Sequence, residues 1–395
     1  MSGWITKKLG EIGAIIRGKG IRRSETISKG MPCIRYGEIY TSYDILLDEP
    51  HSFVTKEIFD ACPHIEHGDV VFTLTGENKE EIAKTLAYLG NEEIAAGGDL
   101  AIWKGHGFNA KFLAYVMNSP QLLKAKALAS NGDIIVHASL KKMAEIPIPI
   151  PPLAEQKRIV AKIHAAFEKI DRLKANAEKN LANAKELFQS TLDEAMRPKN
   201  GWVEKRLGEV CETITDGDHQ PPPKVASGVP FLVISDVSKG YLSFENTRFV
   251  PESYYSRIPE AKKPKKGDVL LTVTGSFGIP VLVDTEKKFC FQRHIALLRT
   301  NQMIPRFLVY QLSSHESFKY FDKVATGTAQ RTVSLSSLRT MEIVLPPSAE
   351  QKRIVEKIGL LEQTLKALQQ NYAQQIADCA EMRQAILREA FEGRL

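Results

Sequence analysis

The sequence contains few cysteines and no long apolar run. Its five cysteines are odd in number and widely spaced, which argues against a disulfide framework and against paired zinc ligands. No apolar segment approaches the roughly 18–20 residues that a membrane-spanning helix needs, and residues 1–8 contain no apolar signal core. We therefore expect a cytoplasmic protein. A metal site at Cys62, His64 and His67 is the less favoured alternative to a polar surface loop, because lysines occupy the corresponding stretch of the second half.

Motifs of nucleotide-dependent and methyl-transferring enzymes are also missing. The sequence has no G-x-x-x-x-G-K-[ST] element, which argues against a P-loop ATPase. It has no N-P-P-[YF] or D-P-P-[YF] element, so the chain is not expected to methylate adenine itself. Residues 275–278, Gly-Ser-Phe-Gly, lack the context of a nucleophile elbow. We predict a non-catalytic protein that binds no metal and no cofactor of its own.

Its composition is that of a soluble globular protein. Of the 395 residues, 43% are hydrophobic and 25% are charged, and the formal net charge is +6. A length of this order allows two or more domains with their own cores. The mild positive excess is compatible with a polyanionic partner but does not by itself indicate one.

The chain is an internal tandem repeat. Residues 154–163, AEQKRIVAKI, recur 195 positions later as AEQKRIVEKI, with nine of ten residues identical. Further matches lie in the preceding segments, where Gly3-Trp4 recurs as Gly201-Trp202 and Gly68-Asp69-Val70 recurs as Gly267-Asp268-Val269. Two copies are too few for a solenoid. The repeat therefore predicts the order domain, helix, domain, helix.

Each repeat ends in a long amphipathic helix. Apolar or small residues recur at steps of three and four from 159 to 191, and the second copy repeats the pattern from 354 to 386 without an insertion. This heptad pattern predicts a coiled-coil seam, and two helices of equal length with matched seams predict antiparallel pairing. Proline pairs precede both helices, and Ser348 with Gln351 predicts a capping box at the start of the second.

The segments before the helices predict two α+β domains. Short strand-like runs such as 70–75, 231–234, 269–274 and 281–283 alternate with turn residues, and helical patches occur near 110–129 and 304–322. The predicted fold is α+β, with two globular domains separated by two long antiparallel coiled-coil helices. The predicted boundaries are residues 1–150 and 199–345 for the domains, and 151–198 and 346–395 for the helices.

Polar loops in both domains carry side chains suited to DNA. Arg pairs efficiently with guanine, Gln with adenine, and hydroxyls and amides hold phosphates. Glu77 has the chemistry to accept from a cytosine amino group. The alternative for any single residue is a solvated loop side chain. The candidate DNA-binding residues of the first domain are Arg17, Lys19, Arg22, Arg23, Thr75, Glu77, Asn78 and Lys79. Those of the second are Thr274, Gly275, Ser276, Gln292, Arg293, His294, Thr326, Gly327, Thr328, Gln330 and Arg331.

The doubled P-P-x-x-E-Q-K-R-I-V element, each copy following a domain that begins G-W-x-x-x-x-L-G-E, resembles the specificity subunits of type I restriction-modification systems. The resemblance covers essentially the whole chain. It implies that each domain reads one half of an asymmetric, split DNA site, and that the helix pair fixes the gap between the halves. It also places the strand end at 274–276 and the Thr-Gly-Thr-Ala loop at 326–330 near DNA. The first domain departs from that loop and reads Ala-Ser-Asn-Gly-Asp at 129–133.

The same resemblance implies partners. Two modification subunits, which use S-adenosylmethionine to methylate adenine at N6, would dock on the helices. Restriction subunits with ATP-driven, Mg-dependent translocation can join the complex. Two other hypotheses compete with this one: a scaffold whose end domains bind peptides, and a nuclease. Salt-dependent DNA binding would separate DNA recognition from the scaffold, and metal-dependent cleavage by the chain alone would indicate a nuclease.

Overall fold

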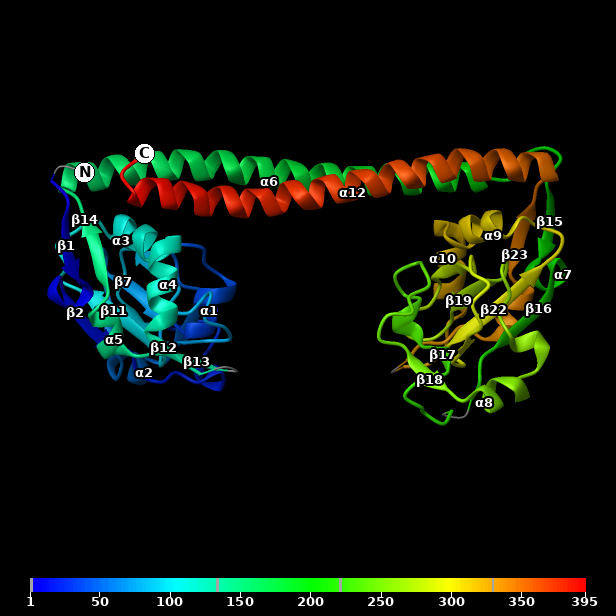
Figure 1. Cartoon of the computed structure of the whole chain (residues 1–395), viewed down its shortest axis with the longest axis horizontal. Helices are drawn as coiled ribbons and strands as arrows, with labels where there is room; N and C mark the ends of the chain where they lie inside the picture. The colour runs from blue at the N-terminus through cyan, green and yellow to red at the C-terminus, as the bar shows by residue number, and fades with distance from the viewer. Residues whose placement is uncertain (1–2, 133–134, 220–221, 329) are drawn as a thin grey trace. The chain divides into compact units, whose positions relative to one another are not determined.

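The computed structural model describes residues 3–132, 135–219, 222–328 and 330–395, so Asp133 and Ala329 of the predicted loops lie outside the described residues. The chain forms two compact units (Figure 1). Unit 1 contains residues 1–178 and 373–395, and unit 2 contains residues 179–372. Helices α6 (Leu153–Met196) and α12 (Ser348–Phe391) each run through both units. None of the helices in the described part of the chain combines the length and apolar character that a bilayer crossing requires.

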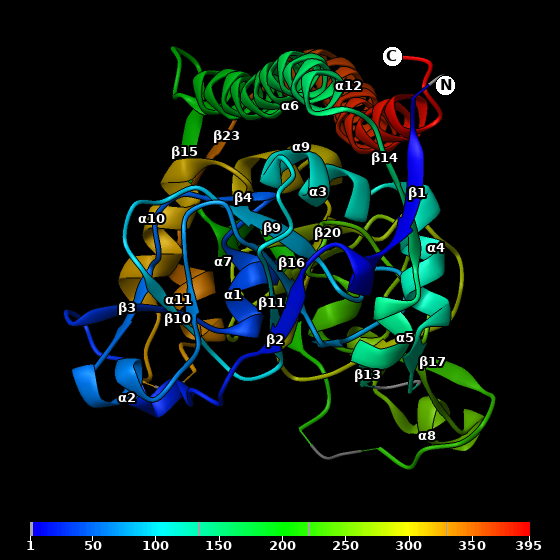
Figure 2. The ribbon, with the colours of Figure 1, turned by 90° about the vertical axis from the view of Figure 1, so that its left-hand side faces the viewer.

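Unit 1 is built on a five-stranded sheet of order β2-β11-β7-β9-β4, beside a four-stranded sheet of order β5-β3-β10-β6. A three-stranded sheet, β12-β13-β8, and the antiparallel pair β1-β14 complete it. Figure 2 shows β1 and β14 side by side below the long helices. The strands are β1 (Ile5–Lys8), β2 (Ala14–Arg17), β3 (Met31–Ile34), β4 (Leu46–Leu47), β5 (Ser52–Val54), β6 (His64–Ile65), β7 (Val70–Thr73), β8 (Thr75–Gly76), β9 (Thr85–Tyr88), β10 (Ile94–Ala96), β11 (Leu100–Lys104), β12 (Ser130–Asn131), β13 (Val136–Ala138) and β14 (Pro147–Ile150). The helices are α1 (Tyr36–Thr41), α2 (Lys56–Asp60), α3 (Ala110–Met117), α4 (Pro120–Leu128) and α5 (Leu140–Ala144).

Unit 2 repeats this topology with fewer strands. Its sheets have the orders β16-β22-β19-β20, β18-β17-β21 and β15-β23. The parallel pair β3·β10 of unit 1 corresponds to the parallel pair β17·β21. The strands are β15 (Val203–Arg206), β16 (Cys211–Asp216), β17 (Val229–Leu232), β18 (Arg248–Val250), β19 (Val269–Thr272), β20 (Pro280–Leu282), β21 (Cys290–Phe291), β22 (Ile295–Thr300) and β23 (Glu342–Leu345). The helices are α7 (Leu207–Val210), α8 (Glu252–Arg257), α9 (Pro305–Leu312), α10 (His315–Val324) and α11 (Leu335–Thr340).

The central strand of each unit is buried on both faces. In β7, Val70 and Phe72 pack into one hydrophobic cluster while Val71 packs into another. Because successive side chains point to opposite faces of a sheet, a continuous apolar run is the pattern for a strand covered on both sides. The corresponding β19 divides its residues between two clusters in the same way. The predicted α+β class and these two strands are confirmed.

Within each unit the two long helices pack antiparallel. In unit 1, Cys379 of α12 lies against Ile170 of α6, and Arg383 forms an ion pair with Asp171. The strict heptad seam is wrong in places, because Leu173, Leu187 and Met382 are exposed. Near the helix ends, the buried positions also pack in the same hydrophobic clusters as α3 and α9 of the globular parts, which widens the buried face beyond a two-helix seam. The buried residues there include Leu192, Met196, Leu387 and Phe391.

The predicted capping box at Ser348 is also wrong. The buried Gln351 side chain accepts a hydrogen bond from the backbone N–H of Ile304 at 2.8 Å and donates one to the carbonyl of Pro346 at 2.9 Å. Gln156 does the same in unit 1, accepting from Asn109 N and donating to Pro151 O, both at 2.9 Å. Each glutamine therefore joins the start of a long helix to the start of α3 or α9.

Lys126 of α4 is fully buried in unit 1. Its ammonium donates to the carbonyl of Ala83 at 2.8 Å, and that carbonyl also accepts from Thr85 Oγ1 at 2.8 Å. Ala83 holds a left-handed backbone with φ of 57°, in the loop that follows the candidate DNA residues 75–79. Burial, with no charged partner among the residues that the structure describes, disfavours the ammonium form and lowers the pKa of Lys126 to about 7.

We predict that Lys126→Met stabilises the protein near neutral pH. Below about pH 7, Lys126 is charged in both the folded and unfolded states, so the cost of burying the charge is fully present. As pH rises from there toward the unfolded pKa, the folded state loses its proton first. The unfolding free energy of the unaltered protein should then rise relative to the variant, by up to about 1.4 kcal/mol per pH unit.

Urea unfolding at pH 7, 8 and 9 measures this difference. Lys124→Met is the matched control, since Lys124 is exposed on the same helix. A constant stability gap between K126M and the unaltered protein across that range would contradict the assignment.

Candidate nucleic-acid interface

The structure brings together two of the predicted segments of unit 2. Thr274 and Thr326 both form antiparallel bridges to Thr332, and the Thr332 hydroxyl lies 3.2 Å from that of Thr274. The backbone N–H of Gly275 donates to the carbonyl of Arg331 at 2.9 Å. The strand end at 274–276 and the loop at 326–332 therefore form one continuous polar edge.

Glycine shapes this edge at two points. Gly275 has φ of +68° and Gly327 has φ of +108°, which L side chains rarely adopt. A side chain at Gly275 would meet nothing within 4 Å, so the surface beside it is open. The polar side chains that accompany these turns, Ser276, Thr328 and Gln330, are exposed.

Arg331 is held by its own unit. Its guanidinium donates to the Asp322 carboxylate at 2.6 Å and to the Asp322 backbone carbonyl, and it lies over the Phe277 ring, 5.4 Å from the ring centre. Phe277 in turn stacks on Phe318. The Asp322 charge offsets that of Arg331, so this arginine contributes less positive potential than an unpaired one would.

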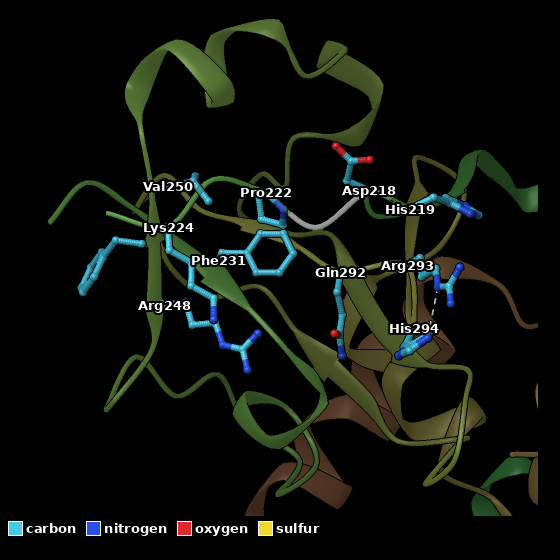
Figure 3. Close-up of a pocket in the computed structure, with 11 residues that line it drawn as sticks. Asp218, His219, Pro222, Lys224, Phe231, Arg248, Val250, Gln292, Arg293 and His294 are labelled. Carbon is cyan, nitrogen blue, oxygen red and sulfur yellow. Dashed lines mark hydrogen bonds between the residues drawn. The ribbon is translucent and has the colours of Figure 1, made fainter. Parts of the chain in front are cut away.

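Gln292, Arg293 and His294 follow β21 and line a cleft of about 240 Å³. In Figure 3 the Gln292 side chain lies between Arg248 and His294. The carbonyl of His294 accepts from Val273 N at 2.9 Å, next to Thr274, so the cleft adjoins the threonine edge. The other lining residues are Asp218, His219, Pro222, Lys224, Phe231, Phe249 and Val250.

The cleft is predominantly basic. Lys224, Arg248 and Arg293 are exposed. The acidic side chain of Asp218 accepts a hydrogen bond from Tyr254 at 2.5 Å. Partial burial, together with the charge of Arg293, lowers the pKa of His294, which favours a neutral ring. Arg293 Nε lies 3.3 Å from Nε2 of that ring. A surface with this balance attracts phosphate and offers amide and guanidinium donors to base edges.

In unit 1 the two predicted segments meet at one turn. The candidate loop begins at Arg17, which ends β2 and forms an exposed 3.5 Å ion pair with Asp99. The backbone N–H of Leu74, next to Thr75, donates to the carbonyl of Asp99 at 2.7 Å. The remaining basic side chains of the loop, Lys19, Arg22 and Arg23, are exposed.

The candidate residues around and after Thr75 differ in their exposure and in their hydrogen bonds. Asn78 is engaged in shaping its own loop, since its amide oxygen accepts from Glu81 N at 2.8 Å and its amide nitrogen lies 3.3 Å from the Glu81 carboxylate. Glu77 and Lys79 are exposed. Thr75 itself is nearly buried, and its hydroxyl lies 3.2 Å from Nδ1 of His137.

The sequence analysis missed Lys224, Arg248 and His219, of which His219 and Lys224 come from the segment between β16 and β17 and Arg248 comes from β18. No spacing in the sequence indicates that they meet, because they come together through the β17·β18 pair and through bridges from Asp218 to Gln292 and from Val225 to Phe249. The alternative metal residues His64 and His67 each contact backbone carbonyls, at Phe59 and Leu89.

Comparisons with known proteins bear on this geometry. A family model described as type I restriction modification DNA specificity domain matches residues 1–183 and again residues 199–377. The type I restriction enzyme EcoKI specificity subunit of Escherichia coli strain K12 is 24% identical in an alignment covering 100% of this chain and 89% of that protein. The two family matches coincide with the two repeats.

Two solved structures share the fold. One, described as showing complex assembly and conformational transition of the type I R-M system, has a TM-score of 0.78 at 22% identity and covers 100% of this chain and 99% of the other. The crystal structure of the HsdS subunit from Thermoanaerobacter tengcongensis has a TM-score of 0.55 at 22% identity and covers 100% and 98%.

We predict that the double variant Lys224→Ala, Arg248→Ala weakens DNA binding in a salt-dependent way. Each phosphate contact that is lost should reduce the slope of log affinity against log salt by about 0.9, giving a change of up to about 1.8 for the pair. Titration of duplex DNA at several salt concentrations measures the slope. The control is Lys239→Ala with Lys319→Ala, which removes the same charge from outside the cleft lining. Equal slopes for both double variants would show that DNA does not occupy the cleft.

Proposed function

The chain belongs to the family of type I restriction-modification DNA specificity subunits, and from this premise we propose that it reads a two-part, asymmetric DNA site while docking two methyltransferase subunits. The observation that carries the proposal is that the two units repeat the same sheets but present different polar loops at the ends of the central strands. Both units share their strand order, yet unit 2 presents a basic cleft and a threonine edge, whereas unit 1 presents an arginine-rich loop. Different edges on one framework favour two different half-sites.

The long helices support the two-part site. Both α6 and α12 contain 44 residues, and both run through the two units. A helix rises about 1.5 Å per residue. The number of residues therefore sets the length of each long helix, and side-chain substitutions leave that length unchanged. We propose that this length sets the gap between the half-sites.

The docking proposal rests on exposed residues that recur. Burial explains why the repeat keeps Gln156 and Gln351, but it does not explain Lys157 and Arg158, which are exposed and recur as Lys352 and Arg353. Even the local ion pair recurs: Glu155 holds Arg158 at 2.6 Å, and Glu350 holds Arg353 at 2.7–2.8 Å. Two exposed surfaces that repeat the same lysine, arginine and glutamate fit two copies of one partner; they differ in that Arg158 also donates to the Leu395 carbonyl at 2.8 Å.

The partners would supply the chemistry. The names of the relatives agree with the prediction that this chain is a specificity subunit and not an enzyme. We propose that adenine-N6 methylation is carried out by modification subunits that bind S-adenosylmethionine. ATP and Mg would be bound by restriction subunits where these join the complex.

The first test is a methylation map. We expect that co-expression with the neighbouring modification subunit in a methylation-free host yields N6-methyladenine in a single motif with two short specific halves and a fixed unspecified gap. Long-read sequencing detects the modified bases. A continuous motif, or methylation without sequence preference from a folded and assembled complex, would contradict the proposal.

A charge-reversal series tests the docking surface. Lys157→Glu or Lys352→Glu alone should reduce the bound modification subunits from two to one, and the double variant should bind none. Native mass spectrometry of the purified complexes counts the subunits. Lys169→Glu is the control, because Lys169 is exposed on the same helix but its repeat counterpart is Thr364. If the double variant still binds two subunits, the repeated surface is not the docking site.

A further inference from the structure

Three polar side chains form a row across the small sheet β12-β13-β8 of unit 1. In the register of this sheet, His137 stands directly opposite Thr75 on one side and opposite Asn131 on the other. Directly opposed residues project from the same face of a sheet. Val136 is buried on the other face, while His137 and Asn131 are exposed. The row is therefore a surface feature with histidine at its centre.

Unit 2 contains the same row in different chemistry. Thr332 is bridged to Thr274 on one side and to Thr326 on the other, and the Thr332 and Thr274 hydroxyls are 3.2 Å apart. His137 and Thr332 are separated by 195 residues, the same offset as the two helix repeats. The rows are thus equivalent, Thr-His-Asn in unit 1 and Thr-Thr-Thr in unit 2, and the first member is threonine in both.

We propose that the central residue of each row determines base preference in its half-site, with His137 acting in unit 1 and Thr332 in unit 2. This inference rests on the proposed function and adds residues to it. Both central residues lie beside the candidate segments of their own units, His137 next to Thr75 and Thr332 next to Arg331. A change at the centre alters the exposed chemistry of the row without altering the buried face of its strand.

The hydrogen bond to Thr75 orients the histidine ring. Nδ1 of His137 lies 3.2 Å from the Thr75 hydroxyl, and Thr75 is itself fixed because its carbonyl accepts from Tyr40 at 3.1 Å. With Nδ1 engaged, the opposite atom Nε2 is the one available to a ligand, and it has no hydrogen-bond partner among the described residues. When the hydroxyl donates to Nδ1, Nε2 carries the proton and offers a donor to guanine N7 or O6. The threonine at this place in unit 2 offers a hydroxyl and a methyl group, which suits other base edges.

The test measures methylation by the assembled complex on short duplexes. Each base pair of the two half-sites is substituted in turn, starting from the motif that the unaltered chain produces. We expect His137→Ala to reduce discrimination on the order of tenfold at one or two positions of one half-site. Thr332→Ala should relax positions in the other half-site only. His67→Ala is the matched control, because His67 is exposed in the same unit and also engages a neighbour through Nδ1.

The half-site in which discrimination is lost decides whether the inference holds. Relaxation confined to opposite half-sites in the two variants supports the inference. Unchanged discrimination in His137→Ala overturns it, as does an equal loss of rate on all duplexes, since the latter indicates a phosphate contact. If the unaltered chain yields no two-part motif, the proposed function fails before His137 is tested. Because His137 is exposed, circular dichroism and subunit assembly should match the unaltered complex.

Discussion

Two buried glutamines connect the long helices to the globular parts of the molecule. Gln156 and Gln351 each satisfy a backbone N–H and a backbone carbonyl at the junction of a proline pair, a long helix and a shorter one. Leaving buried groups of this kind unsatisfied costs on the order of 1–3 kcal/mol each. The amide therefore fixes which side of the helix faces the domain. As a result, the adjacent lysine and arginine point outward in both copies, where they form the repeated surface.

The residues proposed to contact DNA lie at the margins of the two central sheets. The central strands β7 and β19 are buried on both faces, so their side chains are set by packing. The polar residues begin where these strands end, at Thr75 and Thr274, and they continue onto the bridged residues His137 and Thr332. The proposed function therefore assigns stability and sequence preference to different residues. One unit can change what it contacts while keeping its fold.

The fold was largely predictable because its signals are periodic or repeated. The ten-residue repeat, the proline pairs and the apolar runs at 70–73 and 269–272 indicated the helices, their starts and the central strands. The heptad seam failed at Leu173 and Met382, which are exposed although their neighbours Ile170 and Cys379 are buried, because the apolar spacing does not show which seam positions a partner helix covers. The prediction of a capping box was wrong because the Gln351 side chain accepts a hydrogen bond from the backbone N–H of Ile304, 47 positions earlier in the chain. The cleft could not be predicted for the same reason: Lys224, Arg248 and Gln292 meet only through strand pairing.

The composition of unit 1 bears on how the protein is made. Its core combines residues from the first part of the chain, such as Phe112 and Phe167, with Leu387 and Phe391, which are synthesised more than 200 residues later. Unit 2 needs only residues 179–372. Although domains usually fold in the order of their synthesis, here the second unit has all of its residues first. Unit 1 therefore cannot complete its core until α12 has been synthesised, and until then the apolar faces of α3 and α6 lack their contacts with α12.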